Sequence, residues 1–154
     1  MCKPADEFCK KVRDFFAAHG GAAAAPIVQA LDNDEWTLRR TAEPRGGSET
    51  KGSVTLGYTD LVNDEIEVNE AASFGQQVTT INHEFWQHAL PRRGSHSGSG
   101  HDPWAQKEAR TLSNMRGAPG IKNGVVYGAH VEAAAKILGV KLPPWNTRGV
   151  PEPK

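Results

Sequence analysis

The chain has 154 residues, a length that suits one domain with its own hydrophobic core. Its 18 basic and 18 acidic residues cancel, which argues against a protein that binds nucleic acid or an anionic membrane through its overall charge. No apolar run is long enough to span a membrane, and the N-terminus lacks the apolar stretch of a signal peptide. We therefore expect a single soluble domain over residues 1–154.

The N-terminus carries the two cysteines of the chain, Cys2 and Cys9. They can form one disulfide that ties the N-terminal arm to the first helix, or they can remain free thiols. The start Met1-Cys2-Lys3 looks like one placed ahead of an excised domain, so we expect the domain to belong to a longer chain. The sequence by itself does not identify the compartment.

The first half of the chain changes from helical to strand-like periodicity. Residues 5–19 are expected to form an amphipathic helix that Gly20-Gly21 ends, and a short helix follows from Pro26 to Leu31. Three short segments then alternate apolar and polar residues, as half-buried antiparallel strands do. These segments are centred on Trp36 and Leu38, on Val54, Leu56 and Tyr58, and on Ile66 and Val68.

The connections between these segments indicate a small antiparallel meander. Glu43–Gly52 has the composition of a loop, and Asn63-Asp64 marks a turn between the second and third strands. Glu65–Glu70 directly precedes the next helix, in the place where zincin peptidases tend to have an edge strand that pairs with an extended substrate.

The second half of the chain is expected to be helical. One helix covers Gln76–Leu90, a second starts at Asp102-Pro103 and runs to about Asn114, and a third covers Val125–Leu138 and ends at Gly139. A Gly/Ser-rich loop, residues 91–101, separates the first two. The order of elements predicts an α+β fold in which a small antiparallel sheet packs against the helix over Gln76–Leu90 and against further helices.

The helix over Gln76–Leu90 carries the residues that indicate chemistry. His83, Glu84 and His88 stand in the segment INHEFWQHAL. Two imidazoles on one helix can hold zinc, which lowers the pKa of a bound water toward neutrality. A glutamate beside the first histidine can activate that water by taking its proton and can pass the proton to a leaving amine. The segment therefore predicts a zinc-dependent hydrolase that cleaves peptide bonds.

The spacing of the two histidines requires a local change in the helix. They are five residues apart, which is about 140° around a regular α-helix, whereas a spacing of four residues gives about 40°. One extra residue accommodated as a π-bulge would return both rings to the same face, and such bulges are frequent at functional sites. We expect a π-bulge between His83 and His88.

The segment HEFWQH resembles the HExxxH motif of the dipeptidyl peptidase III family, a group of gluzincin-type zinc peptidases. The resemblance covers about residues 80–112. It implies that His83 and His88 bind Zn²⁺, that Glu84 is the general base and that a glutamate on a later helix is the third ligand. Glu108, in QKEARTL, is the matching candidate. The chain is far smaller than members of that family and looks more like a minimal zincin domain at the end of a bacterial toxin or effector.

Other residues compete for the roles that the motif leaves open. His96, His101 and Asp102 are alternatives to Glu108 as third ligand, although Asp102 also suits the N-cap of its helix. A donor to a transition-state oxyanion is also needed, and His130 is the first candidate, ahead of Tyr58 and Tyr127.

Three other functions remain open. A nuclease toxin could use His83, His88, His96 and His101 around a metal, but the neutral charge and the lack of histidine in the strands speak against it. In a non-catalytic binding module the histidines would be structural. A Cys–His amidase would need Cys2 or Cys9 as nucleophile.

The hydrolase hypothesis also carries expectations about partners. The substrate is a peptide or protein, with the stem peptide of peptidoglycan as one option, and neither nucleic acid nor a membrane is expected. A toxin or effector domain would be secreted or delivered as part of a larger bacterial protein, and it would require a cognate immunity or inhibitor protein.

Overall fold

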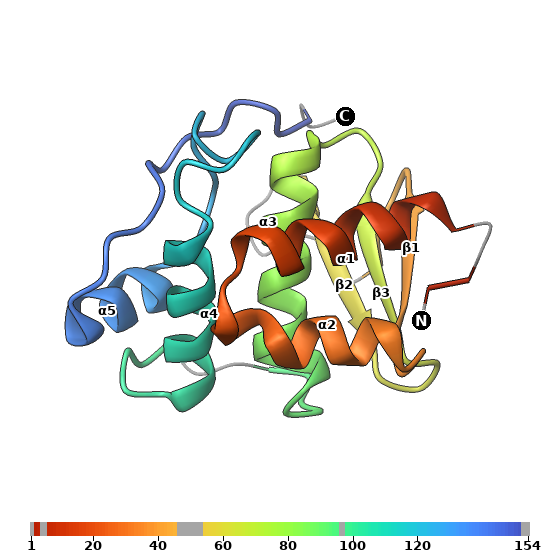
Figure 1. The fold of residues 1–154 in the computed structure, drawn as a ribbon, viewed down its shortest axis with the longest axis horizontal. Helices are drawn as coiled ribbons and strands as arrows, with labels where there is room; N and C mark the ends of the chain where they lie inside the picture. The colour runs from red at the N-terminus through yellow and green to blue at the C-terminus, as the bar shows by residue number, and fades with distance from the viewer. Residues whose placement is uncertain (1, 4–5, 46–53, 96–97, 152–154) are drawn as a thin grey trace.

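Five α-helices, one π-helical turn and three strands are present in a computed structural model that describes residues 2–3, 6–45, 54–95 and 98–151 (Figure 1). In chain order the elements are α1 (Glu7–His19), η1 (Ala22–Ala24), α2 (Ala25–Asp32), β1 (Thr37–Thr41), β2 (Gly57–Asp60), β3 (Glu65–Asn69), α3 (Phe74–Glu84), η2 (Phe85–Ala89), α4 (Pro103–Asn114) and α5 (Ala129–Leu138). This arrangement confirms the predicted α+β class.

The helix boundaries follow local signals in most places. The side chain of Asp6 accepts a hydrogen bond from the backbone N–H of Cys9 at the start of α1, and Gly139 ends α5 in the left-handed conformation. The predicted start of the last helix at Val125 is wrong, because α5 begins at Ala129. Val125 instead exchanges backbone hydrogen bonds with the segment around Trp145. Most of the predicted loop Glu43–Gly52 lies outside the described residues.

The sheet has the strand order β1-β3-β2 and is mixed. β2 and β3 form the expected antiparallel hairpin, and Asp64 in its turn has a left-handed backbone. β1, however, pairs with β3 in parallel, so the prediction of a wholly antiparallel meander is wrong for this strand. The cause is that the hairpin docks on β1 through its second strand. Glu65–Asn69 is therefore the central strand, so the prediction that this segment is an edge strand is wrong; β1 and β2 are the edges.

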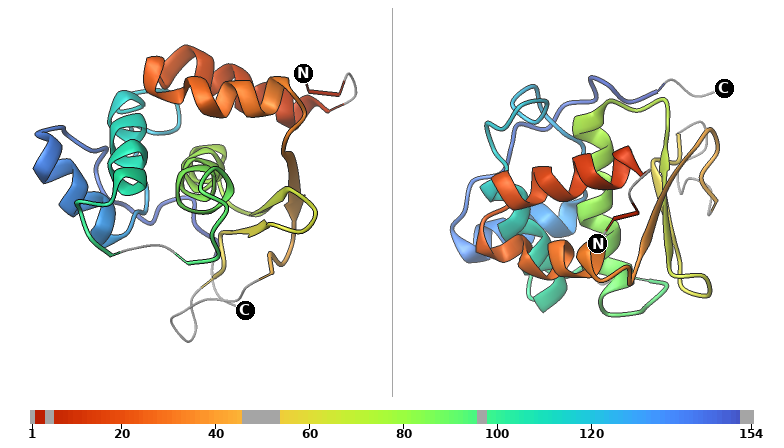
Figure 2. Two further views of the ribbon diagram at one scale, coloured as in Figure 1. Left: turned by 90° about the horizontal axis from the view of Figure 1, so that it is seen from below. Right: turned by 45° about the vertical axis from the view of Figure 1, so that its right-hand side comes forward.

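Helix α3 and its continuation η2 lie at the centre of the fold. The left view of Figure 2 shows this helix end-on. In that view α1 and α2 lie on one side of it, the sheet lies on a second side, and α4 and α5 lie on the side away from the sheet. Ile81, Phe85 and Trp86 are buried in the main core, which draws on all of these layers. Because α3 is enclosed, polar side chains on it lie inside the protein as well.

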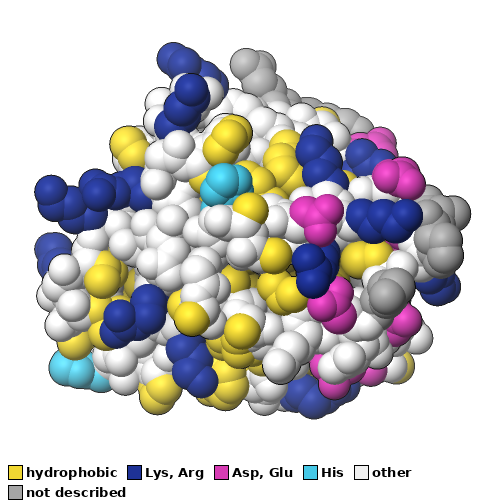
Figure 3. Space-filling model, viewed as in Figure 1, with side chains coloured by type: hydrophobic (Ala, Val, Ile, Leu, Met, Phe, Trp, Pro, Cys, Tyr) yellow, Lys and Arg dark blue, Asp and Glu magenta, His cyan; other side chains and the backbone are white. Residues whose placement is uncertain are grey.

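On the side shown in Figure 3, the acidic side chains gather on the right-hand part, and the left-hand part shows Lys and Arg without them. Lys and Arg side chains are spread over this face, and on its right-hand part they alternate with Asp and Glu. A continuous basic stripe, as nucleic acid binding requires, is not seen on this face. Among the described residues, none of the helices has the length and apolar character needed to cross a membrane.

Cys2 and Cys9 form a disulfide, which decides between the two alternatives left open by the sequence. The bond fastens the N-terminal arm to the first turns of α1, where both cysteines are buried. A disulfide-bonded cysteine has no thiolate to act as a nucleophile, so the Cys–His amidase alternative is excluded for this form of the protein.

We predict that a double variant, Cys2→Ser with Cys9→Ser, unfolds more readily than the wild type. The cysteines are separated by 7 positions, and opening so short a loop lowers the free energy of unfolding by about 2 kcal/mol through the entropy of the unfolded chain. Urea unfolding followed by tryptophan fluorescence measures the difference. A reductant should destabilise the wild type only, and two titratable thiols in the unreduced, unfolded wild type would contradict the disulfide.

Candidate metal centre

The π-helical turn η2 brings His83 and His88 to the same side of their helix. The backbone N–H of Leu90 donates to the carbonyl of Phe85 at 2.9 Å, a bond that spans five residues in place of four. The two imidazole rings then lie with their centroids 5.5 Å apart. The predicted π-bulge is thus confirmed, and it removes the rotation of about 140° that a regular helix would impose.

Each of these histidines has its Nδ1 atom next to an acceptor. His88 Nδ1 lies 3.0 Å from the backbone carbonyl oxygen of Arg93, and His83 Nδ1 lies 3.2 Å from both carboxylate oxygens of Glu108. Arg93 is itself held by ion pairing with Asp102 at 2.7 Å. Since a carbonyl oxygen can only accept, His88 carries its proton on Nδ1, and its Nε2 can offer a lone pair.

Glu84 is held inside the protein by the edge strand. Its Oε1 accepts a hydrogen bond from the Thr59 hydroxyl at 3.0 Å, and its Oε2 lies 3.7 Å from His83 Nε2. The residue is only 6% exposed. Strand β2 can approach α3 this closely because Gly57 has no side chain: a Cβ there would collide with Cγ2 of Thr80.

Glu108 reaches the same cluster from α4 and His130 reaches it from α5. Glu108 Oε1 lies 3.2 Å from His130 Nε2 and accepts a hydrogen bond from Gln87 Nε2 at 3.0 Å. The carboxylate is 3% exposed. The described residues contain two sets of possible ligand atoms, and within each set all atoms lie within 4.8 Å of one another. Both sets include His83. One set is His83, Glu84 and His88, and the other is His83, Glu108 and His130.

Burial and neighbouring charges shift the pKa values of the cluster in opposite directions. Burial by itself would lower the pKa of His83, but the carboxylates of Glu108 and Glu84 raise it to about 9. Burial raises the pKa of Glu84 above its ordinary value, although the charge of His83 and the hydrogen bond from Thr59 act to lower this pKa. For Glu108 the effect of burial is outweighed by His83 and His130, which hold its pKa below its usual range. In the metal-free protein Glu108 is therefore the ionised partner of His83.

A cavity of about 680 Å³ opens beside this cluster. The segments Val54–Gly57 and Val126–His130 line it. His83, Glu84 and Glu108 line it as well. Of the side chains predicted to act on a substrate or to bind the ion, these three and His130 therefore face one common space, whereas His88 does not line it. The edge strand β2 contributes its first residue, Gly57, to the lining.

The remaining predicted site residues lie elsewhere or are otherwise engaged. Asp102 is at the N-cap position of α4, but its carboxylate pairs with Arg93. His101 is exposed and is not part of either ligand set, and His96 lies outside the described residues. Tyr127 lines the cavity but donates its hydroxyl to Pro143, whereas Tyr58 does not line it and packs against Arg45.

Three residues that shape the site carry no signal that sequence patterns reveal: Thr59, Gln87 and Arg93. Thr59 and Gly57 lie two positions apart and so on one face of β2, but nothing local says that this face meets Glu84. Gln87 lies within the motif itself, and its role depends on Glu108 from another helix. Arg93 contributes its backbone carbonyl, for which residue type gives no signal.

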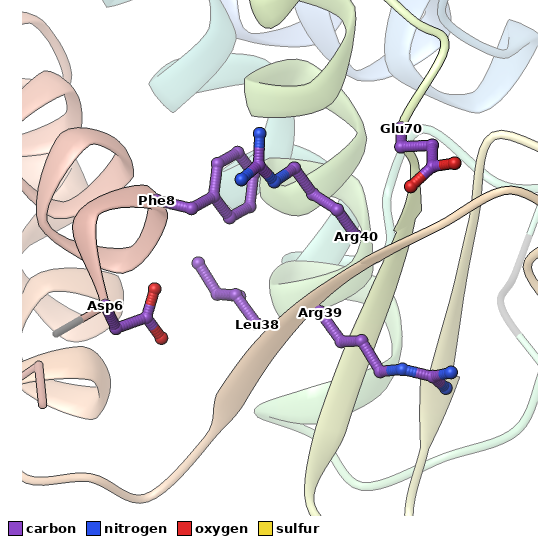
Figure 4. A pocket seen from close by; sticks show the side chains of 6 residues that line it. All are labelled: Asp6, Phe8, Leu38, Arg39, Arg40 and Glu70. Atoms are coloured by element: carbon purple, nitrogen blue, oxygen red, sulfur yellow. The ribbon is translucent and has the colours of Figure 1, made fainter.

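A second hollow, of about 510 Å³, lies between the start of α1 and β1 (Figure 4). Its Arg40 guanidinium lies 4.7 Å above the centre of the Phe8 ring, while Arg39 reaches away toward the sheet and pairs with Glu67 at 2.8 Å. Asp6 is occupied in capping α1. No group of metal-ligating side chains was found here among the described residues, so the cluster around His83 is the candidate site.

In comparisons with known proteins, the chain matches no family model, no curated protein and no solved structure. What can be said of its function therefore depends on the cluster itself.

We predict that the metal-free protein loses stability as the pH rises. The folded-state pKa of His83, about 9, lies above its ordinary value of 6.5, so folding is favoured by proton binding. This contribution is complete below about pH 6.5 and is lost as the pH passes through about 9, and it amounts to at most about 3 kcal/mol. Urea unfolding in the presence of a chelator measures it. A His83→Gln variant should show a smaller decline, and an equal decline in both proteins would refute the assignment.

Proposed function

We propose that this chain is a metal-dependent hydrolase of peptide bonds, with zinc as the metal, His83 and His88 as ligands and Glu84 as general base. The observation that carries the proposal is the π-helical turn, which brings both histidines to one side of the helix with Glu84 beside them. Glu108 joins the site either as the third ligand that the resemblance to gluzincins implies or as the carboxylate that fixes His83.

The donor atoms suit a zinc ion. Zinc prefers imidazole nitrogens, and histidines that bind it usually donate their second ring N–H to a carboxylate or a backbone carbonyl. Both patterns occur here, with Glu108 beside His83 and the Arg93 carbonyl beside His88. When bound, such an ion supplies a Lewis acid and makes a water molecule acidic enough to react near neutral pH.

Glu84 is suited to move the proton in this reaction. Thr59 occupies its Oε1, which leaves Oε2 on the side of His83 to receive a proton from the attacking water. Burial makes the carboxylate more basic than an exposed glutamate. The same Oε2 can then pass the proton to the leaving amine, so one side chain serves both steps.

The walls of the cavity suit an extended chain as substrate. Among the residues that the structure describes, β2 pairs with β3 along one side only, so its other side can hydrogen-bond to a peptide backbone. His130 lines the cavity, but its Nε2 lies 3.2 Å from Glu108 Oε1, so its proposed role as oxyanion donor would fall to Nδ1.

We predict that Glu84→Gln retains the metal and loses turnover. The amide has nearly the same shape but cannot take a proton, and general-base catalysis contributes about 100- to 10,000-fold. Denatured casein and a mixture of quenched fluorescent peptides serve as probes, with metal content measured by mass spectrometry. An active Glu84→Gln protein would refute the role of Glu84.

We predict that His88→Ala loses bound zinc, whereas His101→Ala retains it. The two variants make the same change, but only His88 belongs to a ligand set. Metal content and equilibrium dialysis against zinc measure the result after the fold has been checked by circular dichroism. Full zinc binding by His88→Ala would overturn the ligand assignment, and loss of zinc from His101→Ala would add that residue to the site. A wild-type protein that takes up no metal would favour a non-catalytic binding module.

A further inference from the structure

The Glu108 carboxylate already has several partners inside the protein. Its Oε1 lies 3.0 Å from Gln87 Nε2 and 3.2 Å from His130 Nε2, and both of its oxygens lie 3.2 Å from His83 Nδ1. The backbone carbonyl of the same residue accepts a hydrogen bond from Asn82 Nδ2 at 3.3 Å. Both the side chain and the backbone of Glu108 are therefore hydrogen-bonded to residues of α3 and η2.

The contacts of His83 and His88 indicate which ring nitrogen of each histidine carries the proton. A histidine can offer one lone pair to an ion only if its proton sits on the other nitrogen. In both His83 and His88 it is Nδ1 that lies against an acceptor, Glu108 in one case and the Arg93 carbonyl in the other. With the proton on Nδ1, the lone pair of each neutral ring is on Nε2. Nε2 of His83 is the atom that lies toward Glu84.

We infer that Glu108 is a positioning residue that accepts a hydrogen bond from His83 Nδ1, and that it is not the third zinc ligand. This inference rests on the proposed function and departs from what the resemblance to gluzincins implies. Glu108 and His88 do not belong to one set of ligand atoms, because Glu108 is grouped with His83 and His130. To reach an ion on the Nε2 side of His83, a carboxylate oxygen would have to leave His83 Nδ1, and Oε1 would also have to leave Gln87 and His130.

The role of Gln87 and His130 follows from the same geometry. Gln87 lies within the π-helical turn, and His130 comes from α5, so the carboxylate is held from two sides. An orienting group must itself be fixed in order to hold a ligand within the tolerance of a metal site. The three contacts of Glu108 meet this requirement without a bond to the ion.

The test compares zinc affinity and cobalt spectra of wild type, Glu108→Ala and Glu108→Gln. Cobalt(II) in place of zinc has visible absorption bands that report the number and type of its ligands. A positioning role predicts that Glu108→Ala still binds one ion but about 10- to 100-fold more weakly, with the cobalt bands of the wild type. Glu108→Gln should recover much of the affinity, because the amide oxygen can still accept from His83 Nδ1. Glu132→Ala, an exposed glutamate on α5, is the matched control and should bind as the wild type does.

The outcomes separate the inference from the proposed function. Changed cobalt bands in Glu108→Gln, or loss of binding in both Glu108 variants while each remains folded, would show a direct ligand and overturn the inference alone. If Glu108→Ala fails to fold, the spectrum of Glu108→Gln still decides. A wild-type protein that binds neither zinc nor cobalt would overturn the proposed function, and the inference with it.

Discussion

The enclosed position of α3 and η2 is the constraint on which the rest of the structure depends. A helix surrounded by other elements has to find most of its polar partners inside the protein, since an unpaired buried polar group is costly. On α3 the Oε1 atom of Gln76 and the Oδ1 atom of Asn82 are buried without such a partner among the described residues. Glu84 finds Thr59 on the sheet, and Gln87 finds Glu108 on α4. The candidate site is thus assembled from the same contacts that hold the sheet and the later helices against the central helix. Stability and the arrangement of the cluster are set together.

Local patterns in the sequence were sufficient for the parts of the site that lie on one helix. The five-residue spacing of His83 and His88 predicted a π-bulge, and η2 is that bulge. Strand pairing was harder, because periodicity shows which face of a strand is buried but not which neighbour it takes. β1 pairs in parallel because the hairpin docks through β3, and no local residue signals that choice. The start of α5 was misplaced since Val125 is apolar and buried like a helix residue.

The contacts between distant segments could not be read from the sequence at all. Glu108 was identified as a participant by its motif, but its distance to Nδ1 of His83 depends on how α4 packs against α3. Thr59 has the same limitation, because its role requires both the hairpin register and the glycine two positions before it. Residue type and spacing therefore indicate which chemistry is present, while packing decides whether a given side chain would touch an ion or orient a group that does.

The edge of the sheet formed by β1 has a different consequence. β1 bonds to β3 through the backbone of Thr37 and Thr41, so the intervening backbone groups of Leu38 and Arg40 point outward, away from the sheet. An open edge of this kind invites another chain to add to it. On this strand Arg39 is paired with Glu67, but Arg40 lies over the Phe8 ring, and a second copy along the edge would bring the Arg40 cations of the two copies close together. The sheet should therefore resist edge-to-edge association of copies through β1 in concentrated solution.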